Sequence, residues 1–428
     1  MSLFFLGLAG LAALGAPIFA LLGGLSLFLF HGARIEPAAL IIELARLADM
    51  PSLIAVPLFT FAGYLLAESN APQRILALAE ASLSWLPGGI AVASLGACAL
   101  FTAFTGASGV TIIALGGIIY AVLTRQGYSE KFSLGLITTT GSLGLLFPPS
   151  LPIILYALVA KISINQLFAA TLIPGLILLV LLSIYAMRAG ARPEAERARR
   201  AAPTPFKWDS FKKALREAIW EVPLPLLIIG GIYGGIFTAS EAAAVMAFYV
   251  MVVEILIYRD VKASAVPEVM IKSMTLVGAI LIVLGTALGL TNYLIDAEIP
   301  NRLFSWLQTH ISGPNEFLIL LNVFLLVVNM VEIFSAIIIV VPIIVPIALK
   351  YGINPIHLGS LFLLNLEIGY MTPPMGLNLF LSSRRFEKPL PEIYRAAFPF
   401  WLILISFLVL VTYIPGISLW LPKILKIQ

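Results

Sequence analysis

Two short motifs interrupt the apolar sequence of this chain at equivalent places, 225 residues apart. They run from Gly144 to Ser150 (GLLFPPS) and from Gly369 to Met375 (GYMTPPM), and each places a glycine and a Pro-Pro pair at the same spacing. In hydrocarbon an unpaired backbone N–H or C=O group is costly, so a helix is interrupted only where protein or a polar cavity satisfies the freed groups. Paired interruptions in two halves of a membrane protein indicate the binding site of a secondary transporter.

The same offset recurs around these motifs. The matched pairs are Gly127 with Gly352 (225 residues), Pro87 with Pro314 (227), Pro72 with Pro300 (228) and Arg74 with Arg302 (228). Coincidence is the alternative, because glycine and proline are common residues. A nearly constant offset that drifts by only three residues favours an internal duplication with small loop insertions.

The composition requires a membrane protein. With 60% hydrophobic residues, 11% charged residues and a mean hydropathy of +1.03, the chain has too little polar sequence to cover a water-soluble core. A spanning helix needs about 20 apolar residues. Spans are predicted near 3–30, 51–67, 167–187, 222–237, 241–258, 273–291 and 398–420, and the first stretch has room for a second span that reaches Leu47.

Two hairpins and two broken helices complete the expected set. The hairpins lie near 90–123 and 316–349, with arms of about 14 apolar residues that fall short of a full crossing and therefore suggest re-entrant loops. The alternative is a pair of short, tilted spans. The broken helices lie near 133–159 and 358–383, because proline lacks an N–H group and clashes with the preceding turn.

A basic linker separates the two halves. Residues 188–217 carry nine Arg or Lys and four Asp or Glu, a net charge of +5, whereas the whole chain has +4. Basic loops are retained on the cytoplasmic side, and anionic lipid headgroups explain such a segment more simply than nucleic acid does. The predicted fold is an all-α polytopic membrane protein with two inverted repeats, 1–187 and 221–428, joined by a cytoplasmic linker at 188–220.

Hydroxyl groups beside the hairpin tips and helix breaks are candidate ion ligands. Together with freed backbone carbonyls they offer hard oxygen ligands for Na⁺, and half-helix N-termini can face an anionic substrate. The alternative is that each hydroxyl bonds its own helix or a neighbouring one. The candidates are Ser108, Thr139, Thr140, Ser142 and Thr372.

Ionisable residues inside apolar segments are costly and each needs a role. Glu332 at the second hairpin tip and Glu367 beside the second break are functional candidates, and Asn378 is a weaker one. Glu241 follows Thr238 at the spacing of a capping box. Further expectations are that Glu254 snorkels or forms an ion pair, that Arg384 and Arg385 anchor a helix at the membrane surface, and that the single Cys98 is a packing residue. The three histidines show no metal-site spacing, so neither a transition metal nor another cofactor is expected.

Three segments resemble the large membrane subunit of tripartite ATP-independent periplasmic (TRAP) transporters. They are GSLGLLFPPS from Gly141 to Ser150, PIHLGSLFLLNLEIGYMTPPMGLNLF from Pro355 to Phe380, and FTASEAAAV from Phe237 to Val245. The resemblance covers essentially the whole chain. It implies an elevator-type importer of the bacterial inner membrane, in which the hairpins and broken helices carry substrate past a static scaffold. It also implies sodium coupling, a small membrane subunit, and a periplasmic binding protein that delivers an organic acid.

The resemblance also suggests site residues. Sodium is expected at Gly106, Ser108, Thr140, Gly141 and Ser142 in the first half and at Glu332, Gly369 and Thr372 in the second. Substrate is expected at Ser108, Thr139, Pro149, Ser150, Glu367, Pro374 and Asn378. The chain departs from the family at both tips: Ala107 stands where the family tends to have serine, and Glu332 where aspartate is usual.

Two other functions compete with this one. A stand-alone sodium/dicarboxylate elevator carrier would keep the architecture without the binding protein. An intramembrane enzyme would need paired catalytic aspartates, a Ser/His dyad or an H-E-x-x-H motif within the spans. The sequence contains none of these in its apolar segments, so no enzymatic activity is expected.

Overall fold

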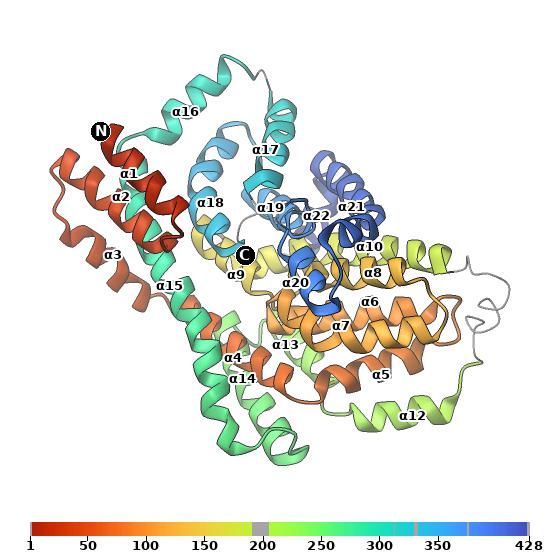
Figure 1. The fold of residues 1–428 in the computed structure, drawn as a ribbon. Helices are drawn as coiled ribbons and strands as arrows, with labels where there is room; N and C mark the ends of the chain where they lie inside the picture. Colours follow the sequence, from red (N-terminus) through yellow and green to blue (C-terminus); the bar gives the residue numbers. More distant parts are fainter. Residues whose placement is uncertain (1, 191–204, 312, 329–332, 375, 426–428) are drawn as a thin grey trace.

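The computed structural model describes residues 2–190, 205–311, 313–328, 333–374 and 376–425. Within these ranges all regular secondary structure is helical, as expected (Figure 1). Seven of the described helices are long and apolar enough to cross a bilayer, and a bent pair in the first half would add an eighth. The seven are Pro51–Glu68, Ser108–Arg125, Ile164–Ala189, Ala239–Ile257, Ala263–Asp296, Ile333–Lys350 and Leu390–Tyr413.

The first half contains ten helices among the residues described. They are α1 (Ser2–Ala13), α2 (Ile18–Ala33), α3 (Ala38–Ala48), α4 (Ala55–Glu68), α5 (Ala71–Leu83), α6 (Gly89–Thr105), α7 (Ser108–Arg125), α8 (Glu130–Leu143), α9 (Leu151–Ala160) and α10 (Ile164–Gly190). Short helical turns lie at Pro51–Ile54 and Gly144–Leu146.

The second half begins after the linker. Its helices are α12 (Trp208–Glu217), α13 (Pro223–Tyr233), α14 (Ala239–Met251), α15 (Val266–Asp296), α16 (Ile299–Gln308), α17 (Pro314–Val328), α18 (Ile333–Lys350), α19 (Pro355–Gly369), α20 (Leu377–Phe386), α21 (Leu390–Tyr413) and α22 (Gly416–Ile424). A π-helical turn at Val252–Ile257 extends α14, and a short turn at Ala263–Ala265 precedes α15.

Two predicted spans differ from the structure. The stretch 3–30 is not one helix, because Gly15 adopts a positive φ of 82° and Pro17 follows it, which separates α1 from α2. The stretch 222–237 contains only the 11 residues of α13. At 1.5 Å per residue α13 is about 16 Å long, which is shorter than a bilayer core.

At the first predicted hairpin α6 packs on α7, whereas at the second a cavity of about 440 Å³ lies between α16, α17 and α18, and the tip lies outside the described residues. The hairpin arms of 17, 18, 15 and 18 residues are longer than expected. Helices of this length reach about 22–27 Å, close to the thickness of the hydrocarbon core. Re-entry of the hairpins therefore stays a prediction.

Both predicted breaks are present. In the first half α8 ends at Leu143, one further turn follows, and α9 starts at Leu151 with its axis bent by 44°. In the second half α19 ends at Gly369 and α20 starts at Leu377. Each break contains its Pro-Pro pair, and proline cannot continue the hydrogen-bond ladder of the preceding helix.

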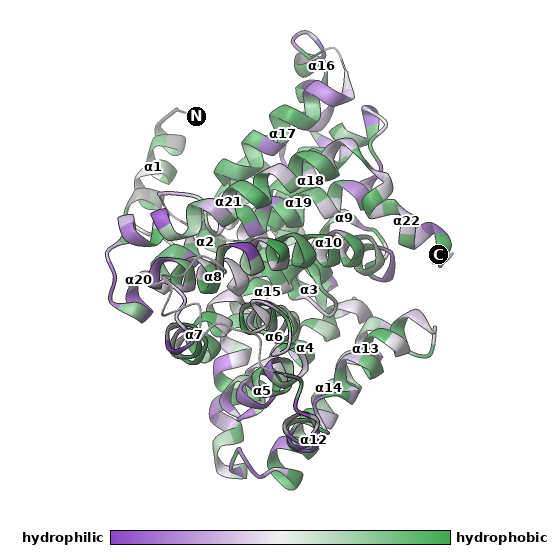
Figure 2. Ribbon diagram, turned by 90° about the vertical axis from the view of Figure 1, so that its right-hand side faces the viewer, coloured by the Kyte–Doolittle hydropathy of each residue, from purple (hydrophilic) through white to green (hydrophobic). Residues whose placement is uncertain are grey.

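Most of the helices fall into two packing groups, which touch each other chiefly where α4 packs on α6 and α15 packs on α18. In one group α15 packs on α2, α3 and α4, and α14 packs on α4. In the other the hairpins and broken helices pack on one another and on α10 and α21. Figure 1 shows the first group at the left and lower side and the second to its right. Figure 2 shows hydrophobic residues along most of α10, α17, α18, α19 and α21.

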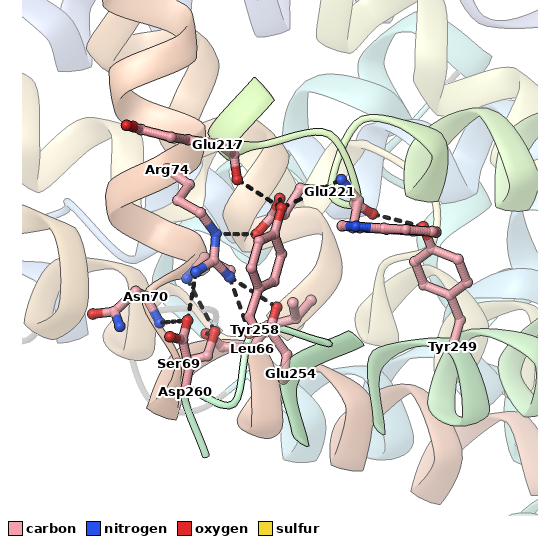
Figure 3. A network of polar contacts seen from close by, with 12 residues as sticks. Leu66, Ser69, Asn70, Arg74, Glu217, Glu221, Tyr249, Glu254, Tyr258 and Asp260 are labelled. Carbon is pink, nitrogen blue, oxygen red and sulfur yellow. Dashed lines mark hydrogen bonds and ion pairs between the residues drawn. The ribbon is translucent and has the colours of Figure 1, made fainter. Parts of the chain in front are cut away.

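A buried charge cluster joins distant parts of the chain (Figure 3). The Arg74 guanidinium, on α5, donates hydrogen bonds to Glu221, Asp260 and Glu254, with Nη2 3.0 Å from Glu254 Oε2. Glu254 is fully buried and Glu221 nearly so. The cluster therefore ties α5 to the segment before α13 and to the end of α14, and it confirms that Glu254 forms an ion pair.

Tyr258 completes this cluster from one face. Its ring lies 3.8 Å below the Arg74 guanidinium carbon, and its hydroxyl donates to the Glu217 carbonyl at 2.6 Å. Burial would raise the pKa of Asp260, but hydrogen bonds from Arg74 and Asn70 outweigh that effect and lower the pKa. Asp260 is thus held in its charged form beside Arg74.

The start of α14 confirms a second expectation. The Thr238 hydroxyl accepts a hydrogen bond from the Glu241 N–H group, and the Glu241 carboxylate accepts one from the Thr238 N–H group at 2.8 Å. This is a capping box, which satisfies two of the N–H groups that a helix start leaves free. Glu241 therefore has a structural role.

Candidate functional site

The first hairpin tip packs directly on the first helix break. The tip turns at Gly106, whose φ of 65° is accessible to glycine at little cost. A Cβ atom added there would lie 2.9 Å from the Leu151 Cβ and 3.5 Å from the Leu151 backbone nitrogen. The start of α7 and the start of α9 are therefore neighbours.

The middle of α8 closes the same region from another side. Thr102 donates a hydrogen bond to the Gly141 carbonyl at 3.2 Å, and a Cβ atom at Gly141 would lie 3.3 Å from the Ser108 carbonyl oxygen. Gly106, Ser108 and Gly141, three of the expected sodium residues, are thus brought together. Backbone carbonyls and hydroxyls converge in this volume.

The hydroxyls of this region fall into two classes. Thr139, Thr140 and Ser142 each donate to a carbonyl of their own helix, to Gly135, Ile137 and Thr139 respectively, at 2.8 to 3.3 Å. In this conformation these three hydroxyls therefore satisfy their own helix, which was the alternative to a role as ion ligands. The hydroxyls of Ser108 and Ser150 are buried and have no hydrogen-bond partner among the described residues. A buried polar group without a partner is costly, so these two serines require a ligand or water.

Two helix N-termini meet at these two serines. Ser108 is the first residue of α7, and Ser150 is the N-cap residue of α9 but makes no capping hydrogen bond. The first N–H groups of a helix lack internal partners and carry partial positive charge. The arrangement suits an anion such as a carboxylate, for which both hydroxyls can act as donors.

The second break is more open than the first. Pro373 and Pro374 are exposed, whereas Gly369 is buried. Thr372 donates to the Ile368 carbonyl at 2.8 Å and accepts a hydrogen bond from the Trp401 indole at 3.0 Å. Of the residues expected here, Thr372 is therefore bonded to its own helix and to α21.

Asn378 links the two broken helices. Its side-chain amide donates to the Thr138 carbonyl at 3.0 Å, and the Thr138 hydroxyl donates to Ser382 at 2.8 Å. The Asn378 Oδ1 atom is buried and has no partner among the described residues. The structure thus places Asn378 beside α8, at the residue directly before the Thr139 to Ser142 segment.

Glu367 is a buried carboxyl group in the second half of the chain. Its side chain is fully buried in α19, and within the described part of the chain neither carboxylate oxygen has a hydrogen-bond partner. An ionised carboxylate cannot stay buried without a cation, a proton or hydrogen-bond donors. The structure therefore supports the selection of Glu367 as a functional candidate. Glu332, expected nearby at the second hairpin tip, lies outside the described residues.

A chain of polar side chains close to Glu367 was not foreseen. The Asn365 side-chain amide donates to the Asn322 side-chain oxygen Oδ1 at 2.8 Å, and the Asn322 amide nitrogen donates to the Thr412 hydroxyl at 2.9 Å. The chain connects α19, α17 and α21 inside the apolar body. Isolated asparagines in apolar runs were the available signal, because a buried amide needs partners.

The described residues contain no group of three or more His, Cys, Asp or Glu side chains placed to hold a metal ion. The oxygen atoms around Ser108 and Gly141 come from hydroxyl and carbonyl groups. These are ligands that suit alkali cations better than transition metals.

The sequence matches a known family model along most of its length. Residues 5–417 match the model described as "Tripartite ATP-independent periplasmic transporter, DctM component". The chain is 36% identical over 405 residues to the C4-dicarboxylate TRAP transporter large permease protein DctM of Pseudomonas aeruginosa, which covers 94% of this chain and 92% of that protein. It is 35% identical over 452 residues to the protein of the same description from Vibrio cholerae, with 99% and 98% covered.

A solved structure has a similar fold. The YdaH transporter of Alcanivorax borkumensis superposes with a TM-score of 0.60 at 16% sequence identity, over 88% of this chain and 87% of that one. At this identity the likeness concerns the arrangement of the helices alone.

Proposed function

The chain belongs to the family of DctM components of tripartite ATP-independent periplasmic transporters, and from that membership we propose that it imports a small organic acid across the bacterial inner membrane, driven by sodium. The proposal names the residues around the first hairpin tip and the two breaks as the site. A carboxylate such as a C4-dicarboxylate, the substrate named for the relatives in Pseudomonas and Vibrio, is the proposed class.

One observation carries this proposal. The unpartnered hydroxyls of Ser108 and Ser150 lie at two neighbouring helix N-termini inside the protein. Positive helix ends and free hydroxyl donors favour an anion, and a carboxylate would satisfy both serines at once. Thr139, Pro149, Pro374 and Asn378 belong to the same proposed substrate site.

Sodium would bind beside this anion. The Ser108 carbonyl oxygen lies 3.3 Å from where a Cβ atom at Gly141 would be, and Thr140 and Ser142 are in the same turn of α8 as Gly141. In the second half Gly369, Thr372 and Glu332 are the corresponding proposed ligands. A cation next to a bound carboxylate lowers the cost of burying either charge, and this mutual dependence couples the two fluxes.

We propose an elevator movement because the helices form two packing groups. The group of hairpins and broken helices would move as one body, together with α10 and α21, against the group of α2 to α4, α14 and α15. Sodium can bias the movement only through a higher affinity for one of the two states.

The proposed partners are a small membrane subunit and a periplasmic substrate-binding protein, in the lipid bilayer of the inner membrane. The chain acts as a carrier and not as an enzyme in this proposal. The alternative, a stand-alone sodium/dicarboxylate carrier, has the same site and no delivering protein.

The test is uptake of labelled succinate into proteoliposomes that contain this chain with its small subunit. Uptake is measured with inward sodium or potassium gradients, and with or without the proposed substrate-binding protein. Uptake that needs both sodium and the binding protein is expected. Sodium-dependent uptake without the binding protein would favour the stand-alone carrier, and uptake of succinate and other organic acids that ignores sodium would refute the coupling.

A further inference from the structure

A pocket of about 420 Å³ lies away from the proposed transport site, between the first turn of α8, the last turns of α10 and the middle of α21. Its polar rim includes Ser129, Lys131 and Arg188. Ser129 caps α8 by accepting a hydrogen bond from the Phe132 N–H group at 3.2 Å. The remaining N–H groups of this helix start add partial positive charge to the rim.

The walls below this rim are aromatic. Phe132, Tyr185 and Phe400 line the pocket, with the Tyr185 and Phe400 rings 5.0 Å apart and nearly perpendicular and the Phe132 and Phe400 rings 5.8 Å apart. Ala189, Ala396 and Pro399 also face it. A cationic rim over an apolar wall matches a molecule with an anionic head and an apolar body.

The two basic side chains at the rim have no counter-ion in the part of the chain that the structure describes. The pocket-lining residues include Lys131 and Arg188 but no acidic residue. The nearest carboxylate along the chain, Glu130, is engaged elsewhere: it accepts from Lys388 at 2.6 Å and from the Tyr120 hydroxyl at 2.8 Å. Among the residues that the structure describes, the pocket thus keeps two positive charges without a carboxylate partner.

The position of the pocket selects the kind of anion. Arg188 lies in the last turn of α10, directly before the basic linker, and Lys131 lies in the first turn of α8. Both helices are candidate spans or parts of one. The ends of spanning helices reach the headgroup level of a bilayer, where basic pockets between such helices collect anionic lipids.

We propose that this pocket binds the phosphate headgroup of an anionic phospholipid, with Lys131 and Arg188 as the phosphate ligands and Phe132, Tyr185 and Phe400 against the glycerol and the start of the acyl chains. The lipid would hold α8 to α10 and α21 at the end of α8 that is opposite to the helix break. Helices α8 and α21 already touch closely below the pocket, since a Cβ atom at Gly135 would collide with the Ala396 carbonyl oxygen.

The test is retention of lipid by the purified full-length protein in native mass spectrometry. Phosphatidylglycerol and phosphatidylcholine are offered separately, to the natural chain and to a Lys131→Gln/Arg188→Gln variant. Each basic side chain near an anionic surface strengthens attraction roughly fivefold, so the double variant should retain phosphatidylglycerol about thirty-fold less well. Phosphatidylcholine should be retained weakly by both proteins.

Three controls make the result decisive. Arg125→Gln removes an exposed basic residue from the last turn of α7, outside the pocket, and should leave retention unchanged. Lys131→Arg/Arg188→Lys keeps both charges and should retain phosphatidylglycerol like the natural chain. Inorganic phosphate, added as a competitor, should displace the lipid only weakly because it lacks the apolar part.

The proposal is overturned if phosphatidylglycerol and phosphatidylcholine are retained equally, or if the double variant retains phosphatidylglycerol as the natural chain does. Efficient displacement by inorganic phosphate would overturn the assignment to a lipid and make the pocket a site for soluble anions. None of these measurements depends on transport, so the outcome is independent of the proposed function.

Discussion

The two helix breaks have the same motif but different surroundings. At the first break Pro148, Pro149 and Ser150 are all buried, whereas at the second Pro373 and Pro374 are exposed. In a carrier with inverted repeats, equivalent elements face opposite sides of the membrane. One closed and one open break is the pattern expected of a single access state. The same motif therefore interrupts a helix at both places, while the packing around each break sets how far it is exposed.

The helices that precede the hairpins show a second difference of this kind. Arg74 on α5 and Arg302 on α16 occupy matching positions in the predicted repeat, but Arg74 is buried among three carboxylates and Arg302 is exposed. The first copy is therefore fixed to α14 and to the segment before α13 by charge, and the second is not. This contrast assigns a bracing role to one copy only.

The largest effect is expected from Arg74→Gln. The substitution leaves Glu221, Glu254 and Asp260 close together without their cation, and removing one partner of a buried pair costs about 3–5 kcal/mol. Arg302→Gln, the matched control, should change the free energy of unfolding by at most about 0.5 kcal/mol. Thermal unfolding of both variants in detergent measures the loss of stability. Equal stability of the two variants would show that Arg74 and Arg302 do not differ in their contribution.

A smaller effect, on transport, is expected from Glu367→Gln. A hydrogen bond or contact to a charged group contributes about 1.5–3 kcal/mol, so uptake should fall roughly ten- to hundred-fold. Folding should be kept, because the amide is no harder to bury than the carboxylate. Uptake is measured beside Glu392→Gln, a substitution at the partly exposed start of α21. Normal uptake by Glu367→Gln would remove this carboxyl group from the site.

The unpartnered serines provide the next test. Ser108→Ala and Ser150→Ala each remove a neutral donor, so uptake should fall by about two- to tenfold at subsaturating substrate. Ser94→Ala is the matched control, because Ser94 is buried on α6, far from the tip, and donates to the Ile90 carbonyl at 2.8 Å. If all three variants transport equally well, the two helix N-termini do not bind the substrate.

The smallest effect is expected from Ser142→Ala and Thr372→Ala. In this conformation the Ser142 hydroxyl donates to a carbonyl of α8 and the Thr372 hydroxyl donates to a carbonyl at the end of α19. A contact with sodium would therefore be made in addition to these hydrogen bonds. The sodium concentration for half-maximal uptake should rise by no more than about tenfold in each, the value of one neutral hydrogen bond. An unchanged sodium dependence in both variants would remove these residues from the proposed ligands.

Much of the fold could be predicted from the sequence because its determinants are local. Apolar length and Pro-Pro pairs define the spans and breaks, and the Thr238 to Glu241 spacing defines a capping box. The division of 3–30 into α1 and α2 was missed, although Gly15 and Pro17 are visible there. The predicted span rests on the length of the apolar stretch alone and takes no account of these two residues.

The polar contacts were less predictable because they join residues that are far apart in the chain. Neither the Arg74 cluster nor the Asn365–Asn322–Thr412 chain has a local signature, since the partners come from different helices. The sequence also could not separate Ser108 and Ser150 from Thr139, Thr140 and Ser142. Only three-dimensional packing decides which hydroxyls find a carbonyl of their own helix.

The most direct test of alternating access uses thiol labelling at the two breaks. The chain has a single cysteine, the buried Cys98, so Cys98→Ser gives a background for Ser150→Cys and Leu377→Cys. In the conformation described here Leu377→Cys should react quickly with a membrane-impermeant reagent and Ser150→Cys slowly. Adding sodium and substrate should change the two rates in opposite directions, and rates that ignore both additions would contradict the account.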